Sequence, residues 1–324
     1  MAKQLTRLRE LGAKVETTEG TFIQPGATDA AILVYDPKVD TDVSMFDRTP
    51  AKDTLGQLAP VAGVRQTRMT FRTEVKGQGA AGGTPEVDVL LAACGMKKVI
   101  VGGASVTYSL LSVHGLSQDT HIVPVSLELR DGSVAYQAKG ARGTFRLMAT
   151  VGEPAFYEWS FLGVFHAVST SGVTFNPTYQ TTVPSPFLSA AAQIHGFTTP
   201  VIRSCSLDLG NDLQIRQDAN SAAGNLSTLV VARNPSGEMD PEMEQPTGGS
   251  TPEPFYTDWI DGTTGNFTFK VGSTPGNICT VNAPSVSYRK ITDAERTGIS
   301  VAGLAFSVNE NVAGSNDDFT IAYT

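Results

Sequence analysis

Alternation of apolar and polar positions dominates the chain and predicts an antiparallel β protein. In 155–165, for example, Tyr157, Trp159 and Phe161 fall on one face at the two-residue period of a strand. Asp131-Gly132 is a favoured hairpin turn between two such runs. The expected strands are 105–113, 122–130, 133–137, 144–151 and 155–165, followed by 201–209, 226–233, 266–271, 278–281, 286–291, 299–308 and 319–323.

Helix signals are few, and their order suggests two similar halves. Thr84-Pro85 is an N-cap followed by a first-turn proline, and Gly95 stops the pattern. Ser185-Pro186 gives the same signal, but a helix over 254–261 fits the order of elements better. Each half then runs strands, long connection, short helix, strands. The polar stretch 169–186 reads as a linker. We therefore expect β modules over 1–175 and 176–324, related by duplication.

Two long connections interrupt the alternation, and long connections in compact domains are usually functional or disordered. The first, 36–66, shows little periodicity and contains Met45, Phe46 and Arg48, which are the candidate residues for self-assembly. The second, 234–254, contains five acidic residues and no Lys or Arg. The second is expected to be a solvated surface loop, with a docking arm as the alternative.

Composition restricts the class of protein. Only 17% of the 324 residues are charged, which is low for a solvated monomer and indicates surface that is buried against partners. The net charge of −8 argues against a protein that binds nucleic acid tightly. It is compatible with a protein past which DNA moves without binding, because a negative surface repels phosphate. Cys94, Cys205 and Cys279 are widely spaced and fit a reducing compartment. No signal peptide or membrane span is evident in the sequence.

Candidate chemical motifs are weak. Gly77-Gln-Gly79-Ala-Ala-Gly82 matches a dinucleotide fingerprint, but Gly83-Thr84-Pro85 separates it from the helix and no acidic residue follows at the ribose-binding distance. No histidine has metal-ligand spacing, and no catalytic serine or phosphate-binding motif is present. We expect no catalytic residues, metal or cofactor. Three carboxylate pairs suit Asp-rich turns better than catalysis: Asp208/Asp212, Asp258/Asp261 and Asp317/Asp318. The basic residues Lys139, Arg142 and Arg146 are expected to form salt bridges between subunits.

The order of several motifs along the chain resembles the tail tube protein of long-tailed, siphovirus-like bacteriophages. The most specific is a strand, Gly-x-Gly, Thr-Pro, a helix and Leu-Leu-x-x-x-Gly-Met, over 71–96. The other matching segments are 16–21, 31–36, 201–211, 233–241 and 276–284.

The resemblance implies a non-enzymatic structural protein of the virion, made and assembled in the host cytoplasm. Its copies would form stacked rings around a hollow tube, closing their sheets into a large β-barrel through which DNA passes without specific binding. Tape-measure, tail terminator and distal tail or baseplate proteins would be its partners, and no membrane is involved. Duplicated halves predict a trimeric ring with pseudo-sixfold symmetry, whereas one barrel module per chain would require a hexamer.

Rival interpretations stay open at this level. A β-sandwich binding or adhesion module for a carbohydrate or surface ligand would stay monomeric. A hydrolase of polysaccharide or cell wall would need a convincing carboxylate pair in a cleft. Among tail-like assemblies, the chain could also belong to a gene transfer agent or to the inner tube of a contractile device.

Overall fold

The computed structural model describes residues 6–170, 175–198, 200–243 and 254–324, which fold mostly into antiparallel β structure. A 3-10 turn over Thr6–Leu8 precedes the strands, and the two α-helices are α1 (Asp88–Ala93) and α2 (Pro254–Asp261). The strands of the first half are β1 (Arg9–Val15), β2 (Tyr35–Arg48), β3 (Leu58–Glu74), β4 (Met96–Val101), β5 (Ser105–Leu110), β6 (Val125–Asp131), β7 (Val134–Thr150) and β8 (Phe156–Ser169). Those of the second half are β9 (Gln193–Ile194), β10 (Phe197–Thr198), β11 (Ser204–Asp208), β12 (Asn211–Gln217), β13 (Asn225–Arg233), β14 (Ser236–Met239), β15 (Gly265–Val271), β16 (Cys279–Arg296), β17 (Ile299–Val308) and β18 (Thr320–Tyr323).

One long sheet runs through both halves of the chain. Its central strands lie in the order β2-β3-β8-β7-β11-β14-β17-β16, with every neighbouring pair antiparallel. The halves join where β11 pairs with Arg146–Thr150 of β7. The sheet of one chain is open and does not close into a barrel. We name these eight strands the main sheet.

The core lies between the main sheet and a second layer. The first part of β7 pairs with β6, which pairs with β1, and the first part of β16 pairs with β18, which leads to β5 and β4. Phe71, Trp159 and Phe161 stack on the core side of the main sheet, with ring centroids 5.8–6.4 Å apart. Each such buried aromatic side chain contributes about 2–3 kcal/mol to folding.

The two halves of the main sheet have the same strand order. In each half the first and second strands form a hairpin, a short helix follows, and the third and fourth strands form another hairpin. The sheet order is first, second, fourth, third in both: β2-β3-β8-β7 in one half and β11-β14-β17-β16 in the other. The helix over 254–261 is confirmed as α2, in the place that α1 has in the first half.

Most expected strands are confirmed within a few residues, and the exceptions have physical reasons. The connection 36–66 is not a loop, because most of it belongs to the hairpin of β2 and β3. The runs 133–137 and 144–151 are one strand, β7, with a bulge between Lys139 and Arg142. The runs 278–281 and 286–291 are also one strand, β16. Pro284 lies there at a register shift, where a missing N–H is tolerated.

The helix expected from Thr84 was placed too early. α1 begins at Asp88, and its N-cap residue Val87 makes no side-chain capping bond. Gly95 does end it, with a positive φ of 88° and an N–H bond to Ala92 O. No helix starts at Ser185-Pro186, where the described residues instead lead to the short strand β9.

Candidate assembly surfaces

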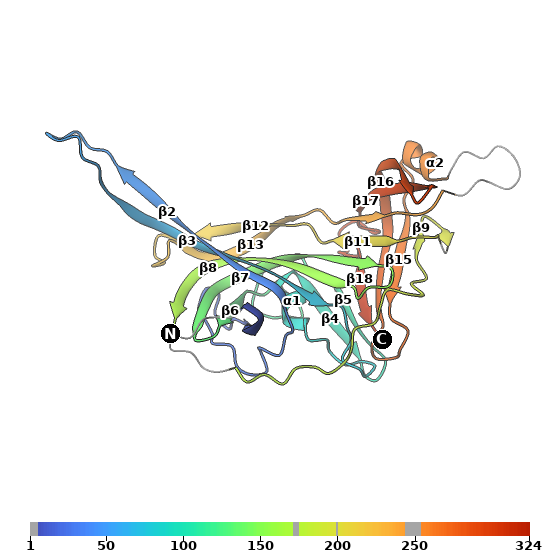
Figure 1. The fold of residues 1–324 in the computed structure, drawn as a ribbon, viewed down its shortest axis with the longest axis horizontal. Helices are drawn as coiled ribbons and strands as arrows, with labels where there is room; N and C mark the ends of the chain where they lie inside the picture. Colours follow the sequence, from blue (N-terminus) through green and yellow to red (C-terminus); the bar gives the residue numbers. More distant parts are fainter. Residues whose placement is uncertain (1–5, 171–174, 199, 244–253) are drawn as a thin grey trace, which may run out of the picture.

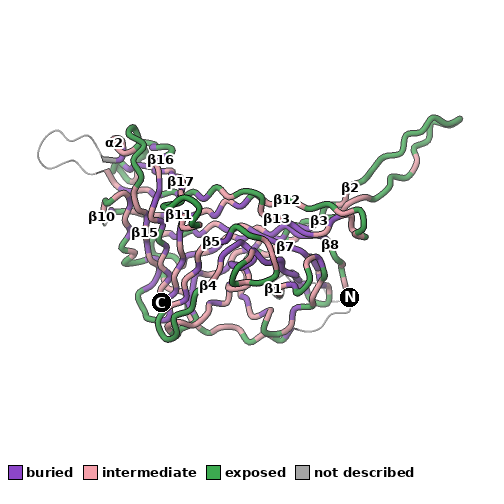
Figure 2. Tube along the Cα trace, turned by 180° about the vertical axis from the view of Figure 1, so that it is seen from behind, coloured by how far each residue is buried: buried purple, intermediate pink, exposed green. Residues whose placement is uncertain are grey.

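The hairpin of β2 and β3 projects far beyond the body of the molecule (Figure 1). β3 pairs with β8 only from Gln66 onward, so residues 43–65 have no sheet neighbour outside the hairpin. None of these residues is buried, and Figure 2 shows the projection in the exposed colour along most of its length. We name residues 43–65 the arm.

The arm carries all three candidate assembly residues. Met45 and Phe46 are 57% and 61% exposed although they point to opposite faces of β2, so neither face of the arm is covered. Arg48 lies opposite Leu58 near the tip and is exposed too. Leu55 at the tip and Val61 on the returning strand add further exposed apolar surface. A concentration of apolar side chains on a projecting hairpin indicates a surface made for a partner.

A second hairpin, β12 and β13, continues β11 and β14 just as the arm continues β2 and β3. This second hairpin is packed against the body instead of projecting (Figure 1). Thr228 Oγ1 donates to Leu162 O at 2.8 Å, and Asn225 Nδ2 donates to Arg65 O at 3.0 Å. These bonds connect the hairpin to β8 and to the base of the arm on β3.

Arg142 is the main anchor of the β12–β13 hairpin. The side chain is fully buried, and its guanidinium donates to Ile122 O and to Thr228 O and forms an ion pair with Glu19 at 3.0 Å. Glu19 in turn accepts a bond from Ser227 Oγ of β13. Sequence reasoning assigned Arg142 and Arg146 to bridges between subunits. That assignment is corrected for both, because Arg146 also pairs within the chain, with Glu238 at 2.5 Å.

Two partly buried histidines, His114 beside β13 and His166 on β8, have lowered pKa values. His114 Nε2 lies 2.9 Å from Val230 O, and burial lowers the pKa of His114 below its usual 6.5; burial and the nearby Lys139 do the same for His166. Both histidines therefore contribute stability above about pH 6.5 that is lost as the pH falls through their folded-state pKa values.

We expect the urea midpoint to fall between pH 6.5 and 5, and to fall less in a His114→Gln, His166→Gln variant. Parallel curves for the two proteins over this range would contradict the expectation.

The main sheet has two free edges within the described part of the chain. β2 pairs with β3 on one side only. β16 pairs with β18 over Cys279–Asn282 and with β15 up to Val286, and from Ser287 to Arg296 it pairs only with β17. The unpaired N–H and C=O groups of such an edge strand can bond to a strand of another chain, which leads either to specific assembly or to aggregation.

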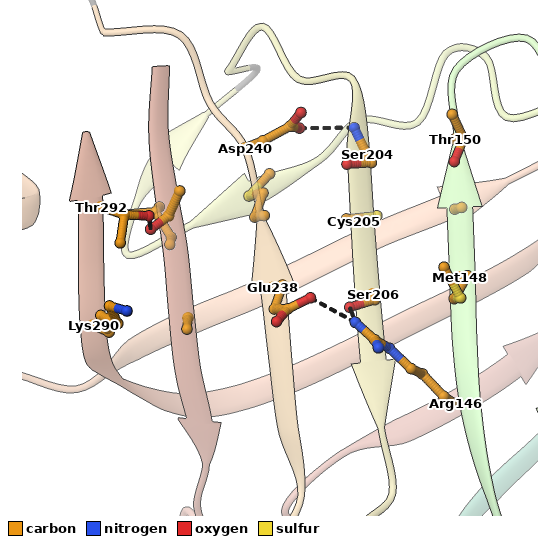
Figure 3. Close-up of a pocket in the computed structure, with 15 residues that line it drawn as sticks. Arg146, Met148, Thr150, Ser204, Cys205, Ser206, Glu238, Asp240, Lys290 and Thr292 are labelled. Atoms are coloured by element: carbon orange, nitrogen blue, oxygen red, sulfur yellow. Dashed lines mark hydrogen bonds and ion pairs between the residues drawn. The ribbon is translucent and has the colours of Figure 1, made fainter. Parts of the chain in front are cut away.

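The face of the main sheet that points away from the core is polar. On β7, Phe145 and Leu147 point to the core while Arg146 and Met148 point outward, and the neighbouring strands alternate in the same way. A hollow of about 370 Å³ lies on this outer face over β7, β11, β14, β17 and β16 (Figure 3). In it Arg146 reaches Ser206 and Glu238, and Asp240 accepts from Ser204 N at 2.7 Å. The hollow is wide and open, and its polar groups bond mainly to one another.

The motifs considered for chemistry have structural partners. Gly77 and Gly79 of the glycine-rich motif lie against the loop at Gly276, and a Cβ on Gly77 would come within 2.1 Å of Gly276 O. The space next to these glycines is therefore occupied by the chain itself. Asp258 holds His195 Nδ1 at 3.1 Å. The described residues contain no cluster of three or more His, Cys, Asp or Glu side chains suited to a metal ion.

Neither of the two described α-helices has the length and apolar character needed to cross a membrane.

The acidic connection 234–254 was only partly understood from the sequence. Its beginning is the strand β14, and Asp240 and Glu242 form ion pairs with Arg296 at 3.3 and 2.6 Å. The expected free loop is therefore wrong for 236–242. Glu244 and Glu253 lie outside the described residues. The free edge of β16 and the packed hairpin were missed by sequence reasoning, since strand pairing between distant segments leaves no local signal.

Comparison with models of protein families gave no match for this chain. Comparison with characterised proteins gave no match either.

Proposed function

We infer that this protein is the self-assembling subunit of a bacteriophage tail tube, built from stacked rings around a channel that passes DNA. The observation that supports this most strongly is an open, curved sheet with a free strand at each end, next to an uncovered apolar arm. Closure of such sheets around an axis removes every free edge, which a single chain of this fold does not do. The resemblance of the sequence motifs to tail tube proteins points to the same function.

Simple geometry supports a ring of three copies. Three main sheets of eight strands would give a barrel of 24 strands. With strands about 4.8 Å apart and tilted by roughly 40°, the wall would be roughly 45–50 Å across between backbones, which leaves a channel roughly 35–40 Å wide between side chains. A channel of this size passes a DNA duplex.

The repeated strand order favours a trimer over a hexamer. Each half supplies four strands in the same order, so three chains would provide six similar modules around the axis. Pseudo-sixfold symmetry follows if the modules 1–175 and 176–324 arose by duplication. The β7–β11 pairing would then be the internal version of the contact between copies, and stacking of rings would be a heterologous contact that builds an open filament.

The polar face of the main sheet would line the channel. Charges of both signs alternate across it: Asp36, Glu158, Asp208, Glu238 and Asp240 against Lys38, Arg72 and Arg146. Several are already paired, Arg146 with Glu238 and Arg72 with Asp36. A mixed surface of this kind cannot release the counterions that drive DNA binding.

We therefore expect assembled protein to retain no duplex DNA at physiological salt. A filter-binding or gel-shift measurement on assembled and dispersed protein tests this, with a basic DNA-binding protein as positive control. Retention that weakens steeply with rising salt would contradict a passive channel.

Sedimentation velocity over a range of concentrations tests the proposed function itself. The expected result is conversion of a 34.2 kDa monomer into large, fast-sedimenting species as concentration rises. A monomer at every concentration and salt tried, with and without a tape-measure protein, would favour the binding-module interpretation instead.

A further inference from the structure

The two long hairpins occupy equivalent places in the two halves, but only one of them is covered. β12 and β13 extend the first and second strands of the second half, and they lie across β7 and β8 of the first half. There Arg142 and Leu162, a register pair of β7 and β8, are only 0% and 7% exposed. The arm extends the first and second strands of the first half and, apart from the bonds of Arg65 at its base to Ala223 and Asn225, lies across no other part of the described chain.

The surface that corresponds to this covered site can be located on the second half. In the first half, the pairing of β3 with the fourth strand, β8, ends at Gln66 and Val164, where the arm begins to project. In the second half, the pairing of β14 with the fourth strand, β17, ends at Ser236 and Ser307. The matching position on the third and fourth strands is therefore the stretch of β16 and β17 around Ser287, Arg289 and Ser307. We name this stretch, Ser287–Lys290 with Ala305–Ser307, the receiving surface.

The receiving surface is uncovered where its counterpart is buried. Arg289 and Lys290 are exposed, and Ser287 and Ser307 are half-buried. Arg289 Nε donates to Ser307 Oγ at 3.0 Å, which holds the guanidinium on the outside of the sheet. The same stretch adjoins the free edge of β16, so a chain that paired with this edge would pass directly beside it.

Resting on the proposed function, we propose that the arm of a second copy lies across the receiving surface, as the β12–β13 hairpin lies across β7 and β8 of its own chain. The arm offers the exposed Asp47 and Asp53 to the basic Arg289 and Lys290, but it also carries Arg48, Lys52 and Arg65. The repeated strand order, and not net charge, therefore selects the partner. In this arrangement Lys290, which pairs with Ala305 two residues before Ser307, has the place that Arg142 has opposite Leu162 within the chain, and Arg289 lies beside it. The partner is another copy of this chain in the same ring.

Cross-linking of assembled protein tests the contact. Cysteines replace Asp47 on the arm and Arg289 on the receiving surface, and a short bismaleimide joins them; the three native cysteines are buried. We expect dimers and closed trimers of the chain in Asp47→Cys, Arg289→Cys protein. The control pairs Asp47→Cys with Val99→Cys on β4, which is 53% exposed but lies in the second layer, and should give neither.

Charge exchange gives an independent readout. Asp47→Lys with Asp53→Lys leaves only basic charges on the arm, opposite Arg289 and Lys290. It should raise the concentration needed for assembly at least about tenfold, because contacts between like charges are strongly unfavourable. Arg289→Glu with Lys290→Glu in the same chain should restore assembly. Tubes that form without the cross-link, or charge reversals without mutual rescue, would overturn this contact and leave the proposed function standing. Failure of the unmodified protein to assemble at all would instead count against the function.

Discussion

Removal of the arm should abolish assembly and leave the fold of the monomer intact. Val43 and Arg65 are register partners, so a chain in which residues 44–64 are replaced by Asn-Gly can close the shortened hairpin with a two-residue turn. None of the removed residues is buried, and their loss should cost less than about 1 kcal/mol of the free energy of unfolding. Sedimentation should show only monomer at concentrations where the full chain forms large species.

A milder variant separates the apolar contacts of the arm from its length. Met45→Asp with Phe46→Asp keeps the hairpin and should also weaken assembly, whereas Val183→Asp should not. Val183 is 76% exposed but lies on the body of the molecule. Assembly of the shortened chain at the normal concentration would show that the arm is not an assembly element.

Arg142→Met should destabilise the protein by about 3–5 kcal/mol. The substitution removes a buried guanidinium that bonds to Ile122 O, Thr228 O and Glu19, and it leaves these acceptors without their donor. Because Thr228 belongs to β13, the β12–β13 hairpin should also become open to proteolysis. Urea unfolding gives the change in free energy, and limited proteolysis reports the hairpin.

Arg146→Met on the same strand is the matched control. Arg146 pairs with Glu238 on the open face of the sheet, where their side chains are 37% and 64% exposed, and ion pairs of this kind contribute about 0–1 kcal/mol. Equal destabilisation by the two substitutions would mean that Arg142 does not anchor the hairpin.

Strands with one buried face were predictable from the sequence, and strands without one were not. β8 shows the two-residue period clearly because Tyr157, Trp159 and Phe161 all enter the core. The arm has no such period, since Met45 and Phe46 are both exposed and nothing selects apolar residues on one side. Its sequence therefore resembles a loop although its backbone is a hairpin.

Contacts between distant segments explain the rest of what sequence reasoning missed. The pairing of β11 with β7 joins the halves into one sheet, but residues 204–208 carry no sign of their partner more than fifty positions earlier. The buried Arg142 is likewise invisible, because an arginine among glycines and alanines in 139–143 reads as surface. The helix over 254–261 was predicted because its place before a strand repeats the order of elements in the first half, whereas the local capping signal at Ser185-Pro186 was misleading. The proposed assembly role of Met45, Phe46 and Arg48 remains a prediction.

End-on electron microscopy of the concentrated, purified protein shows directly whether the chain closes into rings. We expect rings or tubes with a central channel and three large subunits, each with two similar lobes. Six equal subunits would be compatible with a tube but would contradict closure by eight strands from each chain. Isolated monomers alone, in every condition in which the full chain stays folded, would contradict assembly into a tube.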